Sequence, residues 1–169
     1  MSKRKNQKRK SSLENKTAVE SLRFQTLFAL KQMGQENDSF FQKLAETEIS
    51  FISELGLTQD ILDIKNLIDR IRTNLQAEPT TEKGDFCTSI TAIALKIASI
   101  DNLDELQMPT SWQELIDKKI LSIFFPEDKR NAVVAWAKAN GYNTSTYLGC
   151  PIVKFGKLYI KINTLLIIT

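Results

Sequence analysis

The chain has 169 residues, of which 42% are hydrophobic and 25% are charged, a composition typical of a globular protein with one substantial core or two small ones. It contains no histidine, and this excludes Ser-His-Asp and Cys-His nucleophiles, His-ligated zinc and the usual general base near neutral pH. The net charge of +3 conceals a segregation, because residues 11–110 carry nine basic and 16 acidic residues while both ends are basic.

The sequence gives no sign of a membrane span, because no stretch reaches the roughly 18 apolar residues that one needs. The basic start leads into polar sequence and not into an apolar signal-peptide core. We therefore expect a cytoplasmic protein without a membrane partner. Cys87 and Cys150 lie too far apart in the chain to form a Cys-x-x-Cys metal knuckle or a disulfide framework, so we expect both to be reduced.

The first ten residues form a predicted disordered basic tail (1–10) with the sequence MSKRKNQKRK. Such an arm adds affinity for nucleic acid through counterion release, which does not depend on sequence. Nuclear-localisation-like, ribosome-contacting, membrane-surface and solubilising roles remain open for the same cluster. Its cations are Lys3, Arg4, Lys5, Lys8, Arg9 and Lys10.

Residues 11–104 predict an acidic helical bundle that begins with a helical hairpin. A capping box at Ser11 starts a helix that runs to Met33, and a second capping box at Ser39 starts a helix that ends at Gly56. The apolar faces of both helices are broad, and the connection between them is short. We therefore expect the two helices to pack antiparallel.

Two further helices are predicted from apolar residues at spacings of three and four. Thr58 caps the first of these, and Pro79 prevents its continuation. The stripes are Ile61, Ile64, Ile68, Ile71 and Leu75 in one helix, and Phe86, Ile90, Ile93, Ile97 and Ile100 in the other. Four such helices most simply bury their stripes against one another as a bundle. A coiled-coil dimer is the alternative, and the oligomeric state stays open.

Residues 110–169 predict a basic module that begins with two helices. A short helix runs through Trp112 to Ile120, and an apolar segment then leads to Pro126 at the first turn of a new helix. This second helix should cover 127–140, with acids at its start and a lysine near its end, in agreement with the helix dipole.

The remaining segment predicts strands over Tyr147–Val153 and Leu158–Ile162, joined by a tight reversal at 155–156. The order helix, turn, helix and hairpin is similar to the second half of a winged helix-turn-helix, over residues 86–163 at most. This resemblance in element order implies a recognition helix in the major groove and a hairpin wing on the neighbouring backbone. The expected fold class is mainly α with a small C-terminal β-hairpin: an N-terminal helical bundle followed by a winged-helix-like module.

The last 41 residues, from Lys129 onward, contain no Asp or Glu and predict a contact surface for an anionic partner. Arg and Asn can bind base edges, and Lys can bind phosphate. The predicted nucleic-acid contacts in this run are Lys129, Arg130, Asn131, Lys138, Lys154, Lys157 and Lys161. Tyr142, Tyr147 and Tyr159 are candidates for stacking on bases. Solubility or protection of an edge strand explains any one lysine equally well, so the hypothesis requires that the cations share one surface.

The function that these patterns favour is non-enzymatic binding of DNA or RNA, mainly through non-specific backbone contacts, with no catalytic residue, metal or cofactor. The alternative is a protein-interaction adaptor or assembly subunit that docks through the helical bundle. An enzyme is the third possibility and would need a metal site made of carboxylates alone. The carboxylate clusters that could form one are Asp60, Asp63 and Asp69, and Asp101, Asp104 and Glu105, although the same spacing is that of a solvated helix face.

Overall fold

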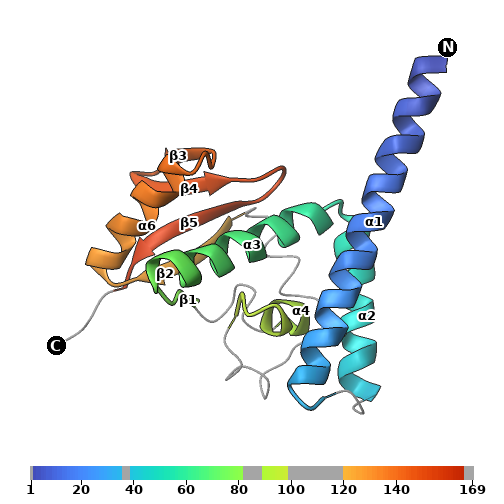
Figure 1. Cartoon of the computed structure of the whole chain (residues 1–169), viewed down its shortest axis with the longest axis horizontal. Coiled ribbons are helices and arrows are strands. Elements are labelled where there is room, and N and C mark those ends of the chain that lie inside the picture. The colour runs from blue at the N-terminus through green and yellow to red at the C-terminus, as the bar shows by residue number, and fades with distance from the viewer. Residues whose placement is uncertain (1, 36–38, 82–88, 99–119, 166–169) are drawn as a thin grey trace.

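The computed structural model describes residues 2–35, 39–81, 89–98 and 120–165, with the backbone alone described for 2–15 (Figure 1). Its elements are α1 (Ser2–Gln32), α2 (Ser39–Glu54), α3 (Thr58–Leu75), β1 (Thr80–Thr81), α4 (Ile90–Ala94), β2 (Ile120–Phe125), α6 (Glu127–Ala139), β3 (Thr144–Tyr147), β4 (Cys150–Lys154) and β5 (Tyr159–Thr164). The fold therefore contains both helices and a sheet, with three helices before the first strand. None of the described helices has the length and apolar character needed to cross a membrane.

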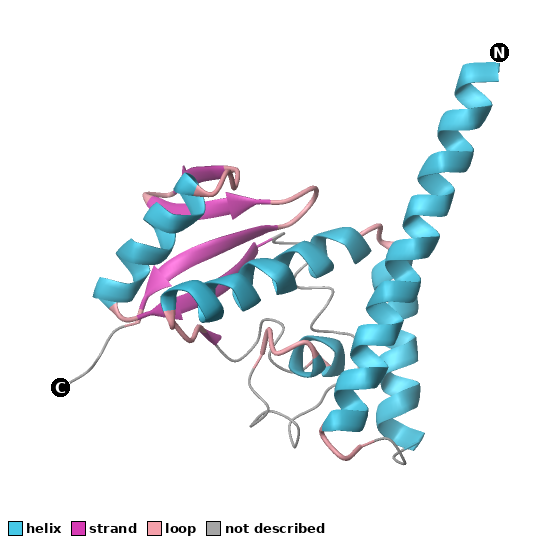
Figure 2. Cartoon of the chain, viewed as in Figure 1, coloured by secondary structure: helices cyan, strands magenta, loops and turns pink. Residues whose placement is uncertain are grey.

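The sheet has five strands in the order β1-β2-β5-β4-β3. Strands β2 and β5 are parallel, while the other neighbouring pairs are antiparallel. After β2 the chain passes through α6 to β3 at the far edge, and two hairpins then return it to β5 beside β2 (Figure 2). The last strand, β5, thus pairs with β2, although α6, β3 and β4 lie between these two strands in the chain.

Helices α3 and α6 lie on the same side of this sheet (Figures 1 and 2). Helix α6 contacts β2, β3 and β5, and α3 contacts α6. The helices cover this face of the sheet because apolar side chains alternate along the strands and point to it. The residues that point to the helices are almost fully buried, while their neighbours are only half-buried. The buried residues are Leu121 and Ile123 in β2 and Ile160 and Ile162 in β5. These side chains belong to one hydrophobic core that continues into α1, α2 and α3.

The helical part agrees with the predicted stripes. Ile61, Ile64, Ile68 and Ile71 on α3 are all buried in the common core, and α2 begins at Ser39 as expected. Helices α1 and α2 run side by side in opposite directions, and α4 packs against both (Figure 1). The antiparallel helical hairpin is therefore confirmed.

Two of the predicted helices differ from the structure. Of the helix expected over 86–100, the described part (89–98) contains only α4, whose start is fixed because the buried carboxylate of Glu48 accepts hydrogen bonds from the Ser89 hydroxyl and the Thr91 amide, both at 2.8 Å. Helix α4 ends before Lys96, whose φ of 59° is left-handed. Helix α1 begins at Ser2 and not at the predicted capping box, so the segment expected as a tail is the start of α1.

The mainly α, winged-helix-like fold class is not confirmed. Ile120, expected in a helix, begins strand β2, and most of the helix that should precede α6 lies in 111–119, outside the described residues. Thr80 and Thr81, which follow the helix break predicted at Pro79, pair with β2. The single expected strand over 147–153 is divided between β3 and β4 by a turn at Leu148–Gly149. Helix α6, the β4–β5 hairpin and its reversal are confirmed.

Candidate nucleic-acid interface

The face of the sheet opposite α6 is the surface that combines cations with aromatic rings. No described helix packs against it. Strand register assigns to this open face Ile120, Ser122 and Phe124 of β2, Ser145 and Tyr147 of β3, Cys150, Ile152 and Lys154 of β4, and Tyr159, Lys161 and Asn163 of β5. No acid occurs among these residues, and two of them are lysines.

Tyr147 and Tyr159 meet on the open face, with ring centroids 6.0 Å apart and planes tilted by 54°. The two rings lie on the same side of the sheet as Ile152, which is only 3% exposed. Lys154 is directly opposite Tyr159 across the β4–β5 pair, and Lys161 follows two residues later on the same face. The structure therefore places an aromatic pair between two ammonium groups.

The polar groups of this cluster have no polar partner in the described part of the chain. These groups are the hydroxyls of Tyr147 and Tyr159 and the ammonium groups of Lys154 and Lys161. Tyr147 is 41% exposed and Lys154 is exposed, while Tyr159 and Lys161 are half-buried. The side-chain hydrogen bonds on the open face among the described residues come from the Cys150 thiol, which donates to the Asn163 amide oxygen at 3.0 Å and to the Ile162 carbonyl at 3.4 Å. The charged and aromatic groups are thus available to a ligand.

The cations of α6 lie on the opposite side of the sheet from Lys154 and Lys161. Arg130 is half-buried, and its guanidinium donates to the Ile162 carbonyl at 3.3 Å and to the Asn131 side chain at 3.2 Å. Lys129 is half-buried and donates to the Leu75 carbonyl at the end of α3, at 3.4 Å. Asn131 and Lys138 remain exposed. The predicted cations do not share one surface, because the sheet separates the two groups.

The hairpin turn between β4 and β5, expected as a free wing, is held against the helices. Asp60 on α3, which is 7% exposed, accepts backbone hydrogen bonds from Gly156 at 3.1 Å, Lys157 at 2.6 Å and Leu158 at 3.0 Å. The Lys157 ammonium donates to the Leu55 carbonyl at the end of α2, at 3.0 Å. Lys157 therefore stabilises the fold, and its charge is partly used within the molecule.

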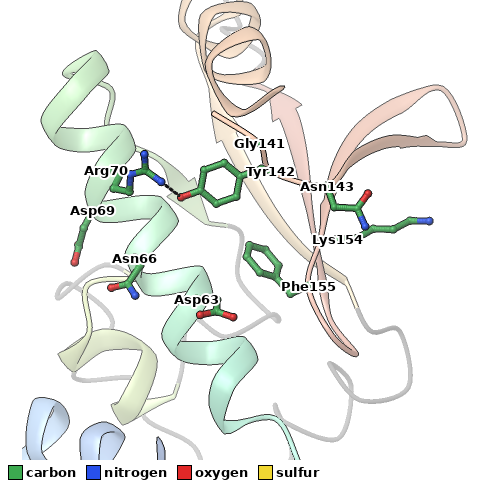
Figure 3. Close-up of a pocket in the computed structure, with 9 residues that line it drawn as sticks. All are labelled: Asp63, Asn66, Asp69, Arg70, Gly141, Tyr142, Asn143, Lys154 and Phe155. Atoms are coloured by element: carbon green, nitrogen blue, oxygen red, sulfur yellow. Dashed lines mark hydrogen bonds between the residues drawn. The ribbon is translucent and has the colours of Figure 1, made fainter. Parts of the chain in front are cut away.

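A hollow of about 580 Å³ lies between α3, the connection from α6 to β3 and the end of β4 (Figure 3). Figure 3 shows Tyr142 reaching Arg70, whose guanidinium donates to the tyrosine hydroxyl at 2.6 Å, whereas Lys154 points away from the hollow. The same guanidinium lies 5.0 Å from the centroid of the Trp136 ring. Tyr142 and Trp136 therefore connect α3 to α6, and of the three candidate tyrosines only Tyr142 is on this side of the sheet.

The carboxylates of α3 do not converge on a metal site. Asp60 binds the hairpin turn, Asp63 accepts a hydrogen bond from Gln59 at 2.9 Å, and Asp69 pairs with Lys65. Within the described residues no group of three or more Cys, Asp or Glu side chains could hold a metal ion. The other carboxylate cluster, at 101–105, lies outside that part of the chain.

Two further surfaces belong to α1. Its first turns contain the six tail cations and extend past α2, away from the rest of the molecule (Figure 1). Further along the helix, Phe24 and Phe28 stack at 6.0 Å and are 69% and 52% exposed. They line a hollow of about 460 Å³ that also includes Leu95. The helical bundle thus has an apolar surface of its own.

Sequence reasoning identified the members of the open-face cluster but not their grouping. Tyr147 and Tyr159 were candidates for stacking together with Tyr142, and nothing in their spacing separates them. The pairing becomes visible only once β3, β4 and β5 are aligned, because Tyr147 and Tyr159 lie two strands apart. The sequence predicts for Asp60 either a solvated position on a helix face or a place in a carboxylate metal site, and its role in binding the turn has no sequence signal. Comparisons with protein-family models, with curated proteins and with solved structures found no match to this chain.

Proposed function

We propose that the protein binds nucleic acid without catalysing a reaction, and that the open face of the sheet is the contact surface. The observation that carries this proposal is the Tyr147–Tyr159 pair beside the ammonium groups of Lys154 and Lys161, which have no polar partner among the described residues, on a face whose strand residues include no acid. Lysine neutralises phosphate, and exposed aromatic rings stack on bases.

The basic start of α1 is a second contact with the phosphate backbone. Its cations follow one another within three helical turns of a helix that leaves the body of the molecule (Figure 1). A cationic segment of this kind adds affinity that is independent of sequence and declines with salt. The open face supplies the orientation, and the α1 start supplies additional attraction.

The winged-helix mode of binding has less support than the open face. It needs Arg130 in a DNA groove and Lys157 on the backbone, yet the first is bound to the Ile162 carbonyl and the second to the Leu55 carbonyl. Of the predicted contacts on the proposed recognition helix, Asn131 and Lys138 are exposed, whereas Lys129 and Arg130 are half-buried. Release of both intramolecular contacts would be required before that mode could operate.

The proposal is tested by measuring equilibrium binding to mixed-sequence DNA and RNA oligonucleotides over a series of salt concentrations. We expect saturable binding that weakens with salt. The double variant Lys154→Gln, Lys161→Gln should bind more weakly and reduce the slope of log affinity against log salt by about one for each lysine that contacts phosphate.

The matched control is Lys43→Gln, Lys96→Gln, which removes the same charge from exposed positions on α2 and just after α4. Equal losses in the two double variants would show that net charge alone attracts the ligand, and would reject the open face as the contact surface.

A second candidate function is a protein-interaction adaptor that docks through the helical bundle, and the exposed pair Phe24 and Phe28 favours it. The same titration separates the two candidates, because an adaptor shows no saturable binding to any oligonucleotide. Phe24→Ser, Phe28→Ser should leave nucleic-acid binding unchanged if the open face is the contact surface.

A further inference from the structure

We infer that the ligand of the open face is a single strand of nucleic acid, with unpaired bases stacked on Tyr147 and Tyr159. This inference rests on the proposed function and adds to it the conformation of the ligand and the part of it that the tyrosines contact. The aromatic pair provides the first argument. In a duplex the flat faces of the bases are covered by their neighbours, so a tyrosine ring can stack on a base only where the strand is unpaired or the base is extruded.

The two rings contact each other but do not stack face to face. Their planes are tilted by 54°, so the pair meets at an angle and the flat faces of the rings are not both covered by the contact. The hydroxyl groups have no polar partner among the described residues, in contrast to Tyr142, whose hydroxyl accepts from Arg70 at 2.6 Å. The Tyr142 hydroxyl binds another element of the fold, whereas within the described ranges the hydroxyls of Tyr147 and Tyr159 do not.

The two lysines are placed to meet the backbone of a strand whose base stacks on Tyr159. Lys154 is opposite Tyr159, where side chains that face each other across strands are about 5 Å apart at Cβ. Lys161 lies on the same face two residues along β5, about 7 Å from Tyr159 by the strand rise. Tyr159 therefore has one lysine beside it across the strands and another along its own strand, and the second ring at Tyr147 receives a neighbouring base.

The edge of the open face also fits an extended strand. The turn after Tyr147 places Leu148 at the rim, where it is 87% exposed, and Ile152 forms an apolar floor beneath the rings. Sheets that carry exposed aromatic rings on one face and helices on the other are a common platform for unpaired bases. The alternative ligand, a duplex held by phosphate contacts alone, would use the lysines and leave the rings without a role.

The experiment compares binding of the unaltered protein to a single-stranded oligonucleotide, to the duplex of the same sequence, and to an abasic strand of the same length, each in DNA, with an RNA strand as a further arm. We expect the single strand to bind at least tenfold more tightly than the abasic strand, because each stacked base contributes about tenfold or more. We expect the duplex to bind more weakly than the single strand as well.

Variants at Tyr159 test whether this ring causes the preference for the single strand. Tyr159→Leu should weaken single-strand binding about tenfold, while Tyr159→Phe, which keeps the ring, should bind within about threefold of the unaltered protein. Neither change should alter binding of the abasic strand. Thermal unfolding of each variant shows whether it is folded, and the three-ligand comparison on the unaltered protein stands even if Tyr159→Leu does not fold.

The possible failures are distinguishable. Equal affinity for the single strand, the duplex and the abasic strand, together with a loss in the Lys154→Gln, Lys161→Gln variant, would overturn the single-strand inference and leave the proposed function in place. Absence of saturable binding to all of the oligonucleotides would overturn both.

Discussion

At the scale of single residues, the lysines of the C-terminal segment have different roles. Lys129 and Lys157 donate to main-chain carbonyls of other elements, whereas Lys154 and Lys161 have no polar partner in the described residues. An ammonium group bound to a carbonyl keeps its charge, but the fold holds it in place and one of its donors is already used. Charge counts along the sequence therefore identified the segment, and the contacts determine which of its members can bind.

Asp60 shows the reverse case, in which an acid stabilises a basic hairpin. Replacement of Asp60 by Ala removes an acceptor from three backbone amides, of which that of Leu158 is buried. We expect the free energy of unfolding to fall by about 2 to 3 kcal/mol, as for loss of hydrogen bonds to a charged group. Urea denaturation measures this change.

Asp63→Ala is the matched control on the same helix, because Asp63 is half-exposed and bonds only to an exposed glutamine side chain. Its effect should stay within about 0.5 kcal/mol. Equal losses in the two variants would mean that the hairpin turn does not depend on the Asp60 contact.

At the scale of elements, the helices were predicted more successfully than the strands for a physical reason. A stripe such as that of α3 is a local property, since residues three and four apart face the same partner. Strand β2 has the sequence ILSIFF, and its alternation of Leu121, Ile123 and Phe125 with half-buried neighbours is recognisable only when one side of the sheet is known to be covered. A short apolar run before a proline fits either a strand or the end of a helix.

The sequence does not predict the β3–β4 turn, because leucine is an unusual residue at the positive φ that Leu148 has there. Leu148 and Gly149 both have positive φ, at 49° and 77°, which is the pattern of a type I′ turn that normally begins with Asn or Asp. Leucine is strained in this conformation, and its side chain is 87% exposed, so it gains little from packing.

Leu148→Asn should therefore stabilise the protein by about 0.5 to 1 kcal/mol. The thermal midpoint measures the change, and Leu148→Ala is the control, since it removes the same exposed side chain without providing a residue suited to positive φ. A greater gain with Ala than with Asn would mean that backbone strain at this turn is not the cause.

At the scale of the whole molecule, the predicted division into an acidic bundle and a basic module is a division of charge but not of core. Leu22 of α1, Ile64 of α3 and Ile160 of β5 belong to the same buried cluster, and β1 from the first half pairs with β2 from the second. The parallel pairing of β2 with β5 joins strands separated by a helix and two hairpins, and no local pattern indicates it. Non-local pairings are the part of this fold that sequence periodicity could not predict.

A shared core predicts that the molecule unfolds as a unit. We expect circular dichroism, which follows the helices, and tyrosine and tryptophan fluorescence, which follows the sheet side, to report the same urea midpoint. Two separate transitions, with the helical signal surviving the loss of the sheet signal, would show that the bundle and the module are independent domains. The variant Asp60→Ala should shift both signals together.

The contact between Asp60 and the hairpin also affects the rate of unfolding. It joins residues that are 96 to 98 positions apart in the chain, while the hairpin itself closes over a turn of a few residues. Local hairpins form quickly, and contacts across long loops form later because loop closure costs entropy. The carboxylate should therefore meet the turn after the main folding barrier, so that Asp60→Ala accelerates unfolding and leaves the folding rate nearly unchanged. The acid that holds the basic hairpin would then determine how long the native molecule persists, and have little influence on how quickly it forms.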